Sequence, residues 1–408
     1  MPNSAAPHPT TEIPLSRPDI TESEIELVVQ TLRSGRLSIG PRLEQFEELV
    51  AARAERLYGI GVSSGTSGLH LALEALNIGP GDEVITTPFS FIASANVILY
   101  VGARPVFVDI CPKSLNMDPA LLEAAITPRT RAIIAVETFG NPRHMEEYEA
   151  IAKRHEIPLV EDCCEALGAA THGRPAGSFG RIGVFAFYPN KQITTGEGGC
   201  IVTSDKRLAG LCRSLRNQGR FVADGPPQLG PAAGLGGVGS GAPIGSWLMH
   251  ERLGYNYRMP ETAAALGVAQ MRRLDEIIGM RQRVADSYMR RLMGNPHIVL
   301  PTIDPETLMS WFVFVVRLAS GFSREERDRI IQGLRRHEIG ANDYFPCIHL
   351  QPFYRADFGF KPGMFPIAES VSQRTIALPF HNRLTEREIG IVCETLEHMI
   401  ERENLKRS

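Results

Sequence analysis

The sequence lacks the cysteine spacings of metal sites and of redox-active CxxC pairs, which argues against metal-binding and disulfide-exchange proteins. Its 408 residues include seven cysteines, and none of them lies in a CxxC pair or at a His/Cys spacing typical of metal sites. The adjacent Cys163 and Cys164 cannot easily bridge each other, because neighbouring side chains of an extended chain point to opposite faces. We therefore expect reduced thiols, no metal site and a cytoplasmic protein.

Long apolar runs and a strong charge of either sign are missing too. No stretch approaches the roughly 18 apolar residues of a membrane span. The first dozen residues are polar and lack the apolar centre of a signal peptide. The net charge of -3 gives no global attraction to nucleic acid or to acidic membranes. With 43% hydrophobic and 22% charged residues, the composition is that of an ordinary globular protein of two or three domains.

What the chain does contain is a regular alternation of short apolar strands with helices. The expected strands lie at residues 84–87, 105–109, 132–136, 158–160, 183–187 and 200–203. Helices are expected between several of them, at 89–100, 119–126 and 145–153. This rhythm predicts an α/β fold with a mainly parallel central sheet flanked by helices on both faces. Ligands bind such sheets at the carboxyl ends of the strands.

The domain organisation follows from changes in this pattern. Residues 1–13 are expected to form a flexible tail, and a large domain spans 14–265. A capping box at 21–24 opens a helix that is expected to bury Ile25, Val28, Val29 and Leu32. Residues 225–249 carry no charge and are crowded with glycine and proline, which predicts an inserted loop. A long helix at 261–292 leads into a smaller α+β domain, 266–408.

The turn at 64–68 precedes a helix that has Leu69, Ala72 and Leu73 on one face. Its free N–H groups and hydroxyls lie at a helix N-terminus, where the dipole favours an anion. A phosphate site is therefore one interpretation, and an ordinary Ser/Thr cap is the commoner one.

Two charged residues follow buried strands. Lys191 lies between the strand at 183–187 and a glycine-rich turn at 196–199, where a ligand can approach the backbone closely. A single lysine is usually a solvated surface charge, but these surroundings favour the neutral amine that Schiff-base chemistry needs. Asp162 ends the strand that begins at residue 158, and it either caps the next helix or faces a cationic partner.

Taken together, the three signals match the needs of pyridoxal 5'-phosphate (PLP). This cofactor needs an anion site for its phosphate, a carboxylate beside its ring nitrogen and a lysine that forms an imine with its aldehyde. The turn at 65–67, Asp162 and Lys191 supply these groups in chain order.

Five blocks of sequence also carry a resemblance to a known family. They are residues 64–69, 161–169, Lys191 with 196–199, 254–259 and 346–349. Through these blocks nearly the whole chain resembles the DegT/DnrJ/EryC1/StrS aminotransferases, a sugar-aminotransferase branch of the PLP-dependent transferases of fold type I. The resemblance implies a homodimer with shared active sites and PLP held as a covalent imine with Lys191.

The resemblance further implies roles for single residues. Lys191 is expected to move a proton between substrate and cofactor, and Asp162 to pair with the ring nitrogen. The remaining expected cofactor contacts are Gly65, Thr66, Ser67, Phe91, Glu165 and Asn256, the last reaching the cofactor of the neighbouring subunit. Substrate contacts are expected from Tyr344, His349 and Arg258.

Two positions depart from the pattern of that family. Ala186 stands where Ser is common, so one phosphate hydroxyl is missing unless Thr194 or Thr195 replaces it. Glu165 stands where Gln or His is common, near the ring hydroxyl of the cofactor. A carboxylate would repel that oxygen, so Glu165 must be protonated or turned away.

The predicted function is ping-pong transfer of an amino group. By resemblance the donor is L-glutamate and the acceptor is the keto group of a nucleotide-linked deoxysugar. Branches of the family that dehydrate or deoxygenate sugars can carry His in place of the lysine, so Lys191 favours transamination. Two alternatives stay open: an aminotransferase for a cyclitol or another ketone, and a PLP-binding regulatory protein without turnover.

Overall fold

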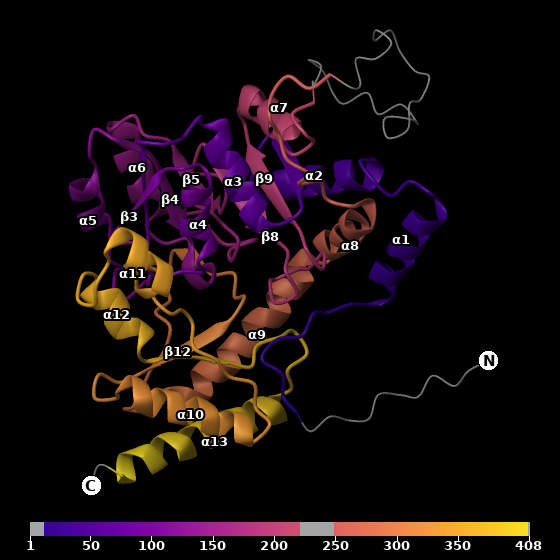
Figure 1. Cartoon of the computed structure of the whole chain (residues 1–408). Coiled ribbons are helices and arrows are strands. Elements are labelled where there is room, and N and C mark those ends of the chain that lie inside the picture. The colour runs from indigo at the N-terminus through magenta and orange to yellow at the C-terminus, as the bar shows by residue number, and fades with distance from the viewer. Residues whose placement is uncertain (1–11, 221–248, 407–408) are drawn as a thin grey trace.

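A computed structural model describes residues 12–220 and 249–406, and Figure 1 shows it coloured along the chain. Nearly all of the predicted tail and of the predicted loop at 225–249 lies outside these residues. The chain forms a part built on a seven-stranded sheet and a part built on a three-stranded sheet, and helix α9 (Leu274–Leu292) runs from one to the other (Figure 1).

The large sheet confirms the predicted α/β class. Its strand order is β1-β9-β8-β5-β4-β2-β3, and β9 alone runs antiparallel to its neighbours. The strands are β1 (Tyr58–Val62), β2 (Glu83–Thr86), β3 (Arg104–Phe107), β4 (Thr130–Val136), β5 (Leu159–Asp162), β8 (Ile182–Ala186) and β9 (Gly199–Thr203). Because β1, β5 and β8 are parallel, their carboxyl ends lie at one edge.

Helices cover both faces of this sheet. On one face, Val160 and Val184 pack in a core with residues of α3 (Gly65–Ala75), α4 (Ala93–Tyr100) and α7 (Lys206–Leu215). On the other face, Leu159 packs with residues of α6 (Met145–Arg154), near α5 (Pro119–Leu122). Phe185 packs on that second face with residues of α2 (Pro41–Arg53) and α8 (Glu261–Arg272). Successive residues of β5 and β8 therefore enter different cores, as strand geometry requires.

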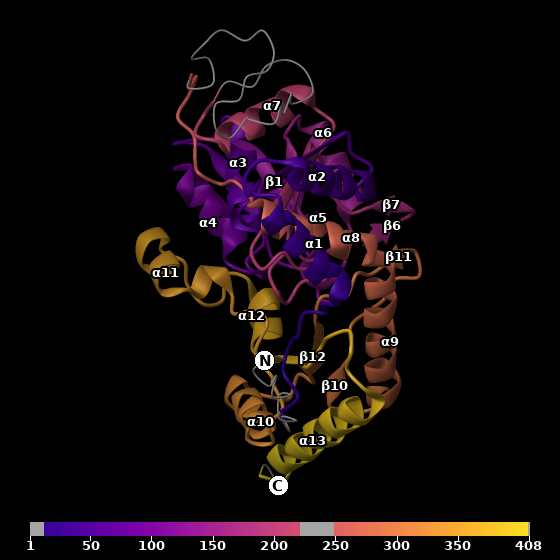
Figure 2. The ribbon, with the colours of Figure 1, turned by 90° about the vertical axis from the view of Figure 1, so that its right-hand side faces the viewer.

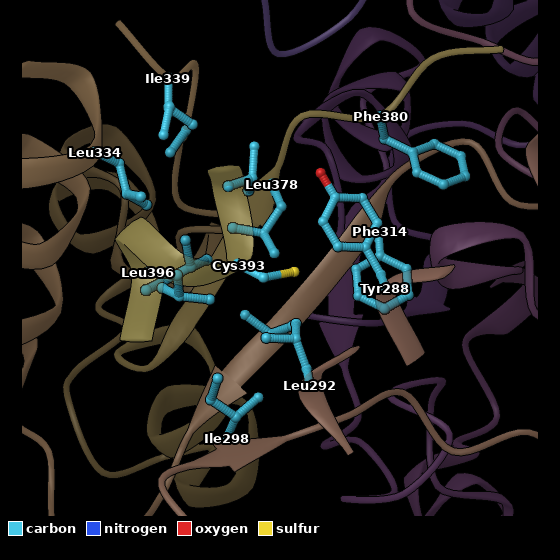
Figure 3. Close-up of a cluster of buried hydrophobic side chains, with 14 of the residues drawn as sticks. Tyr288, Leu292, Ile298, Phe314, Leu334, Ile339, Leu378, Phe380, Cys393 and Leu396 are labelled. Atoms are coloured by element: carbon cyan, nitrogen blue, oxygen red, sulfur yellow. The ribbon is translucent and has the colours of Figure 1, made fainter. Parts of the chain in front are cut away.

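The smaller sheet is antiparallel. It contains β10 (Ile298–Val299), β12 (Phe314–Leu318) and β13 (Thr375–Leu378). Its core brings Tyr288, Phe314 and Leu396 together with apolar side chains of α9, α10 (Arg324–Arg336) and α13 (Glu386–Leu405), as Figure 3 shows. In Figures 1 and 2, α10 and α13 lie at the end of the molecule away from α6 and α7. This part has the predicted α+β character, and the domain limits 14–265 and 266–408 stay predictions.

A few short elements complete the described chain. Helices α11 (Pro352–Phe358) and α12 (Pro366–Ser372) precede β13. A second three-stranded sheet joins β11 (Thr307–Leu308) to β6 (Ala170–Thr171) and β7 (Arg174–Pro175). All seven cysteines are unpaired, and in the described ranges we find no helix with the length and apolarity of a membrane span.

Helix α1 (Glu22–Arg33) begins with the predicted capping box, but only part of its predicted buried face is right: Val28 and Val29 are half-buried. Ile25 and Leu32 are exposed, whereas Glu24 and Leu27 are buried. The reason is polar: a Glu24 carboxylate oxygen accepts hydrogen bonds from Gln270 and Arg273, which turns this side of the helix inward.

Three predicted limits also change. The helix expected at 261–292 is broken at Arg273 into α8 and α9, and the one expected from residue 89 begins at Ala93. Ile13, predicted as the last residue of the tail, is buried, and its N–H donates to the carbonyl of Glu338.

Candidate active site

The start of α3 lies directly against the end of β8. A Cβ atom on Gly65 would lie 2.7 Å from the Ala186 Cβ and 2.8 Å from the Cys164 sulfur, both closer than real Cβ contacts allow. Only glycine therefore fits at this approach. The Ala186 Cβ forms the other side of the contact, and because a serine would carry the same atom, this contact does not explain the departure from the family pattern.

A capping box closes the first turn of α3. The Ser64 hydroxyl accepts the Ser67 N–H at 3.0 Å, and the Ser67 hydroxyl accepts the Ser64 N–H at 2.9 Å. The N–H groups of Gly65 and Thr66 head the helix, where no intrahelical acceptor exists. The sequence left a cap and an anion site as alternatives, and the geometry forms the cap while leaving these two donors for an anion. Phosphate contacts by Thr66 and Ser67 stay predictions.

Asp162 ends β5 as a buried carboxylate. Its Oδ2 accepts the Ser94 hydroxyl at 2.7 Å, and its Oδ1 accepts the Cys164 N–H at 3.2 Å. No helix follows Asp162 directly, so the helix-cap alternative is wrong. Across residues 12–220 and 249–406, no lysine or arginine forms an ion pair with it, although it is only 5% exposed. The carboxylate is thus available for a cationic group such as a protonated ring nitrogen.

Lys191 is held in the loop after β8. Its side chain is 13% exposed, with Nζ 3.7 Å from the Glu165 Oε1 and 4.3 Å from the centre of the Phe312 ring. Its carbonyl accepts a hydrogen bond from the buried Arg281 at 2.7 Å. Phe312, which the sequence did not single out, comes from the region just before β12. The chain therefore surrounds the predicted catalytic amine with one carboxylate and one aromatic face.

Glu165 is neither exposed nor turned away from Lys191. It is 4% exposed, and its Oε2 accepts the Phe139 N–H at 2.8 Å. Burial raises the pKa of Glu165 to about 7, against the opposing effect of the Lys191 charge. A pKa near 7 allows Glu165 to hold or release a proton at neutral pH, and its protonation beside the ring hydroxyl of the cofactor stays a prediction.

The glycine-rich turn does not offer spare hydroxyls. The Thr194 hydroxyl donates to the Phe187 carbonyl at 3.1 Å and accepts the Gly196 N–H at 2.9 Å. The Thr195 hydroxyl donates to the Glu197 carbonyl at 2.7 Å. Both side chains hold the turn itself, so neither replaces the hydroxyl that is missing at Ala186.

Three predicted residues form no contact with Lys191 among the described residues. Phe91 is 60% exposed in the segment before α4. Asn256 is exposed and pairs through its backbone with Asn217, whose side-chain oxygen accepts a hydrogen bond from Arg258 at 3.0 Å. In the part of the chain that the structure describes, none of the three contacts Lys191 or Asp162, and their site roles stay predictions.

Of the two remaining predicted substrate residues, Tyr344 adjoins the Lys191 site and His349 does not contact it in the described residues. The Tyr344 ring lies nearly parallel to the Phe312 ring at 6.5 Å, and so adjoins the aromatic face beneath Lys191. His349 is fully buried, with Nε2 3.1 Å from the Glu369 carboxylate, and burial lowers the pKa of His349. The described residues show no contact between His349 and the Lys191 site, so its substrate role stays a prediction.

Sequence reasoning missed a second group of acids, which lies on the other side of β5. Glu161 accepts the N–H groups of Gly177 at 2.9 Å and Gly180 at 2.5 Å, and lies 3.8 Å from Arg56. Glu137, just after β4, is fully buried. The sequence feature that could have identified Glu137 is its position directly after strand β4, which resembles the position of Asp162 at the end of β5.

Comparison with known proteins decides the family. Residues 18–397 match the DegT/DnrJ/EryC1/StrS aminotransferase family. The chain belongs to this family. It is 36% identical over 391 residues to the GDP-perosamine synthase of Caulobacter vibrioides, covering 95% of this chain and 98% of that protein. It is therefore a sugar aminotransferase of a PLP-dependent family.

Solved structures of the family have the same fold. DesV of S. venezuelae is 34% identical with a TM-score of 0.81, and the match covers 92% of this chain and 94% of DesV. Spr1654 of Streptococcus pneumoniae, solved in a PLP form, is 29% identical with a TM-score of 0.86, over 96% and 99% of the two chains. The donor set fits the cofactor: among the described residues, a buried carboxylate without a cation, two helix N–H groups without an acceptor and a shielded lysine lie at one sheet edge.

Proposed function

We propose that this sugar aminotransferase moves an amino group from L-glutamate to the keto group of a nucleotide-linked deoxysugar. The observation that carries the proposal is the buried arrangement of Lys191 above Phe312, with the unpaired Asp162 carboxylate at the end of the neighbouring strand. A relative named for a nucleotide-linked amino sugar, GDP-perosamine synthase, supports the acceptor class.

The side chains of the site divide the work. PLP, when bound, supplies the electron sink through which an amino group leaves one carbon and joins another. Lys191 holds the cofactor covalently and, when neutral, takes and returns a proton at the substrate carbon. Asp162, oriented by the Ser94 hydroxyl, places negative charge beside the ring nitrogen. Gly65 and Thr66 direct their N–H groups at the phosphate.

We further propose that the enzyme works as a homodimer with shared sites. Apolar side chains are exposed on the large part of the chain, including Phe91, Ile25 and Leu32, and burial of such groups favours association. The exposed Asn256 is then free to reach the cofactor of the partner subunit. Light scattering should give twice the mass of one chain, and Asn256→Ala should weaken PLP binding without lowering that mass.

The first experiment tests the chemistry. The purified protein should be yellow, and glutamate should shift its spectrum to the pyridoxamine form. Lys191→Ala should lose the covalent cofactor and at least about 10³-fold of the turnover, since it removes the group that moves the proton. A variant that still transaminates would overturn the assignment of Lys191. No spectral shift with any amino acid would favour the regulatory alternative.

The second experiment identifies the acceptor. The pyridoxamine form is mixed with keto-sugar nucleotides and, separately, with cyclitol ketones, and the return of the PLP absorbance is followed. We expect return with a keto-sugar nucleotide. Return with cyclitol ketones alone would replace the proposed acceptor while keeping the aminotransferase assignment.

A further inference from the structure

Lys191 needs a proton acceptor, because a protonated amine is neither a nucleophile nor a base. The structure offers one candidate next to it. The Lys191 Nζ lies 3.7 Å from the Glu165 Oε1, and this is the one ion pair that Lys191 forms within residues 12–220 and 249–406.

We propose that Glu165 is the proton acceptor of Lys191 and that the two side chains share one proton. An N–H bond of the Lys191 ammonium breaks, its electron pair stays on Nζ, and an O–H bond forms at the Glu165 Oε1. A pair of opposite charges becomes a neutral amine and a neutral acid, so the net charge of the buried site does not change. This role rests on the proposed function of Lys191.

The geometry prepares the pair for this transfer. The Phe139 N–H holds the Glu165 Oε2 at 2.8 Å and thereby leaves Oε1 for Lys191. The Phe312 ring lies 4.3 Å from Nζ on the lysine. Closing the gap between Nζ and Oε1 by about 1 Å gives an ordinary hydrogen bond, which a lysine side chain reaches by small torsional changes. Because both side chains are largely buried, the proton need not pass through solvent.

The groups around Glu165 are consistent with this exchange. Burial and, to a smaller extent, the nearby Asp162 charge raise the pKa of Glu165 to about 7, against the opposing effects of the Lys191 charge and the Phe139 N–H. Burial also raises the pKa values of the Cys164 thiol and the Tyr344 hydroxyl, so both stay neutral and do not compete for the Lys191 proton. The proton affinity of Glu165 is therefore lower when Lys191 is charged and higher when Lys191 is neutral.

The experiment measures how fast the full-length apoprotein captures PLP at Lys191 between pH 6 and pH 9. Capture is followed by absorbance, and its position is confirmed by borohydride reduction and mass spectrometry. Wild type is compared with Glu165→Gln, which keeps an oxygen for the Phe139 N–H but cannot take a proton. The titration of PLP itself is common to both proteins and cancels in the comparison.

We expect the two pH profiles to differ in slope. In wild type the pair gains a second proton below about pH 7, so the rate should fall there and level off above it. In Glu165→Gln the lysine must release its proton to solvent, so the rate should keep rising with pH and should show no plateau that begins near pH 7. Glu165→Asp keeps a carboxyl group and should restore the plateau. It also serves as a second test if the Gln variant folds poorly.

Phe312→Leu is the matched control. It removes the ring contact of Lys191 but leaves the acceptor, so it should change the rate and keep the plateau. The same slope in wild type and Glu165→Gln would overturn the role of Glu165 while leaving Lys191 as the PLP residue. Failure of every variant and of wild type to capture PLP at Lys191 would overturn both proposals.

Discussion

Two groups of buried carboxylates lie on opposite sides of β5, and they differ in what surrounds them. Asp162, whose neighbour Val160 packs toward α3, forms no ion pair in the described ranges. Glu161 is satisfied by two backbone N–H groups and has Arg56 nearby. One acid is thus left available for a ligand and the other is used to hold the fold. Adjacent residues of one strand can serve these separate ends because their side chains alternate between faces.

Glu137 sharpens the contrast because it has even fewer partners than Asp162. Both of its carboxylate oxygens lack a hydrogen-bond partner among the described residues. Burial and the nearby Glu161 charge raise the pKa of Glu137 well above its usual range. Since Glu161 already has two donors and an arginine, Glu137 is the member of the pair that keeps the proton. Asp162 therefore stays ionised on the site side of β5, whereas on the other side only Glu161 is ionised and Glu137 is neutral.

The largest expected effect comes from removing the charge on the site side. Asp162→Asn keeps the size of the side chain, and its amide can turn the oxygen toward the Cys164 N–H and the NH₂ group toward the Ser94 hydroxyl oxygen. We expect turnover to fall by about 10²–10³-fold, as when one electrostatic contact to a reacting group is lost. The melting temperature should change little, because the Cys164 N–H keeps an acceptor and the Ser94 hydroxyl can donate to the Phe91 carbonyl instead. Steady-state kinetics and thermal unfolding check this, and turnover within fivefold of wild type would contradict it.

A smaller effect is expected from Glu161→Gln, which should lower stability and leave turnover nearly unchanged. In Glu161→Gln one oxygen becomes an NH₂ group, which must then face the N–H of either Gly177 or Gly180. An unmatched buried donor costs about 1–3 kcal/mol of unfolding free energy. Urea unfolding should show this loss, whereas turnover per loaded enzyme should stay close to that of wild type. A variant with normal stability and low turnover would place Glu161 in the site.

Asp162 and Lys191 could be predicted as site residues from the sequence, but the roles of the acids on the other side of β5 were not predicted. Asp162 and Lys191 follow apolar strands, and a parallel sheet brings such strand ends to one edge. Glu137 follows β4 in the same way, although it was not singled out, whereas Phe312 could not be found in this way. Phe312 reaches Lys191 from more than a hundred residues further along the chain, and no local pattern marks a residue whose role depends on such a contact.

Burial of polar groups also explains why the predicted orientation of helix α1 was partly wrong. On α1, hydrophobic periodicity predicted Ile25 and Leu32 inside, but the pairing of Glu24 with Gln270 and Arg273 rotated the helix face. Such a pairing joins segments about 250 residues apart. Tertiary hydrogen bonds therefore decided the face that local apolarity could not.

The smallest effect is expected from Glu137→Gln near pH 4, where the carboxyl group is neutral in the native protein and largely neutral in the unfolded chain. We expect less than about 1 kcal/mol of change in unfolding free energy at that pH. The two proteins should diverge as the pH rises. The unfolded chain releases the Glu137 proton at its ordinary pKa, whereas the native protein retains it, so rising pH stabilises the unfolded state.

Wild type should therefore lose up to about 1.4 kcal/mol per pH unit through this group, and Glu137→Gln should lose none of it. Urea unfolding of both proteins from pH 4 to pH 9 measures the difference, which should grow with pH in favour of the variant. Parallel curves would mean that Glu137 is ionised in the native protein. The ligand atoms of Glu137, Glu161 and Cys163 lie within 4.8 Å of one another, so an ionised Glu137 would then require a cation among them in addition to Arg56.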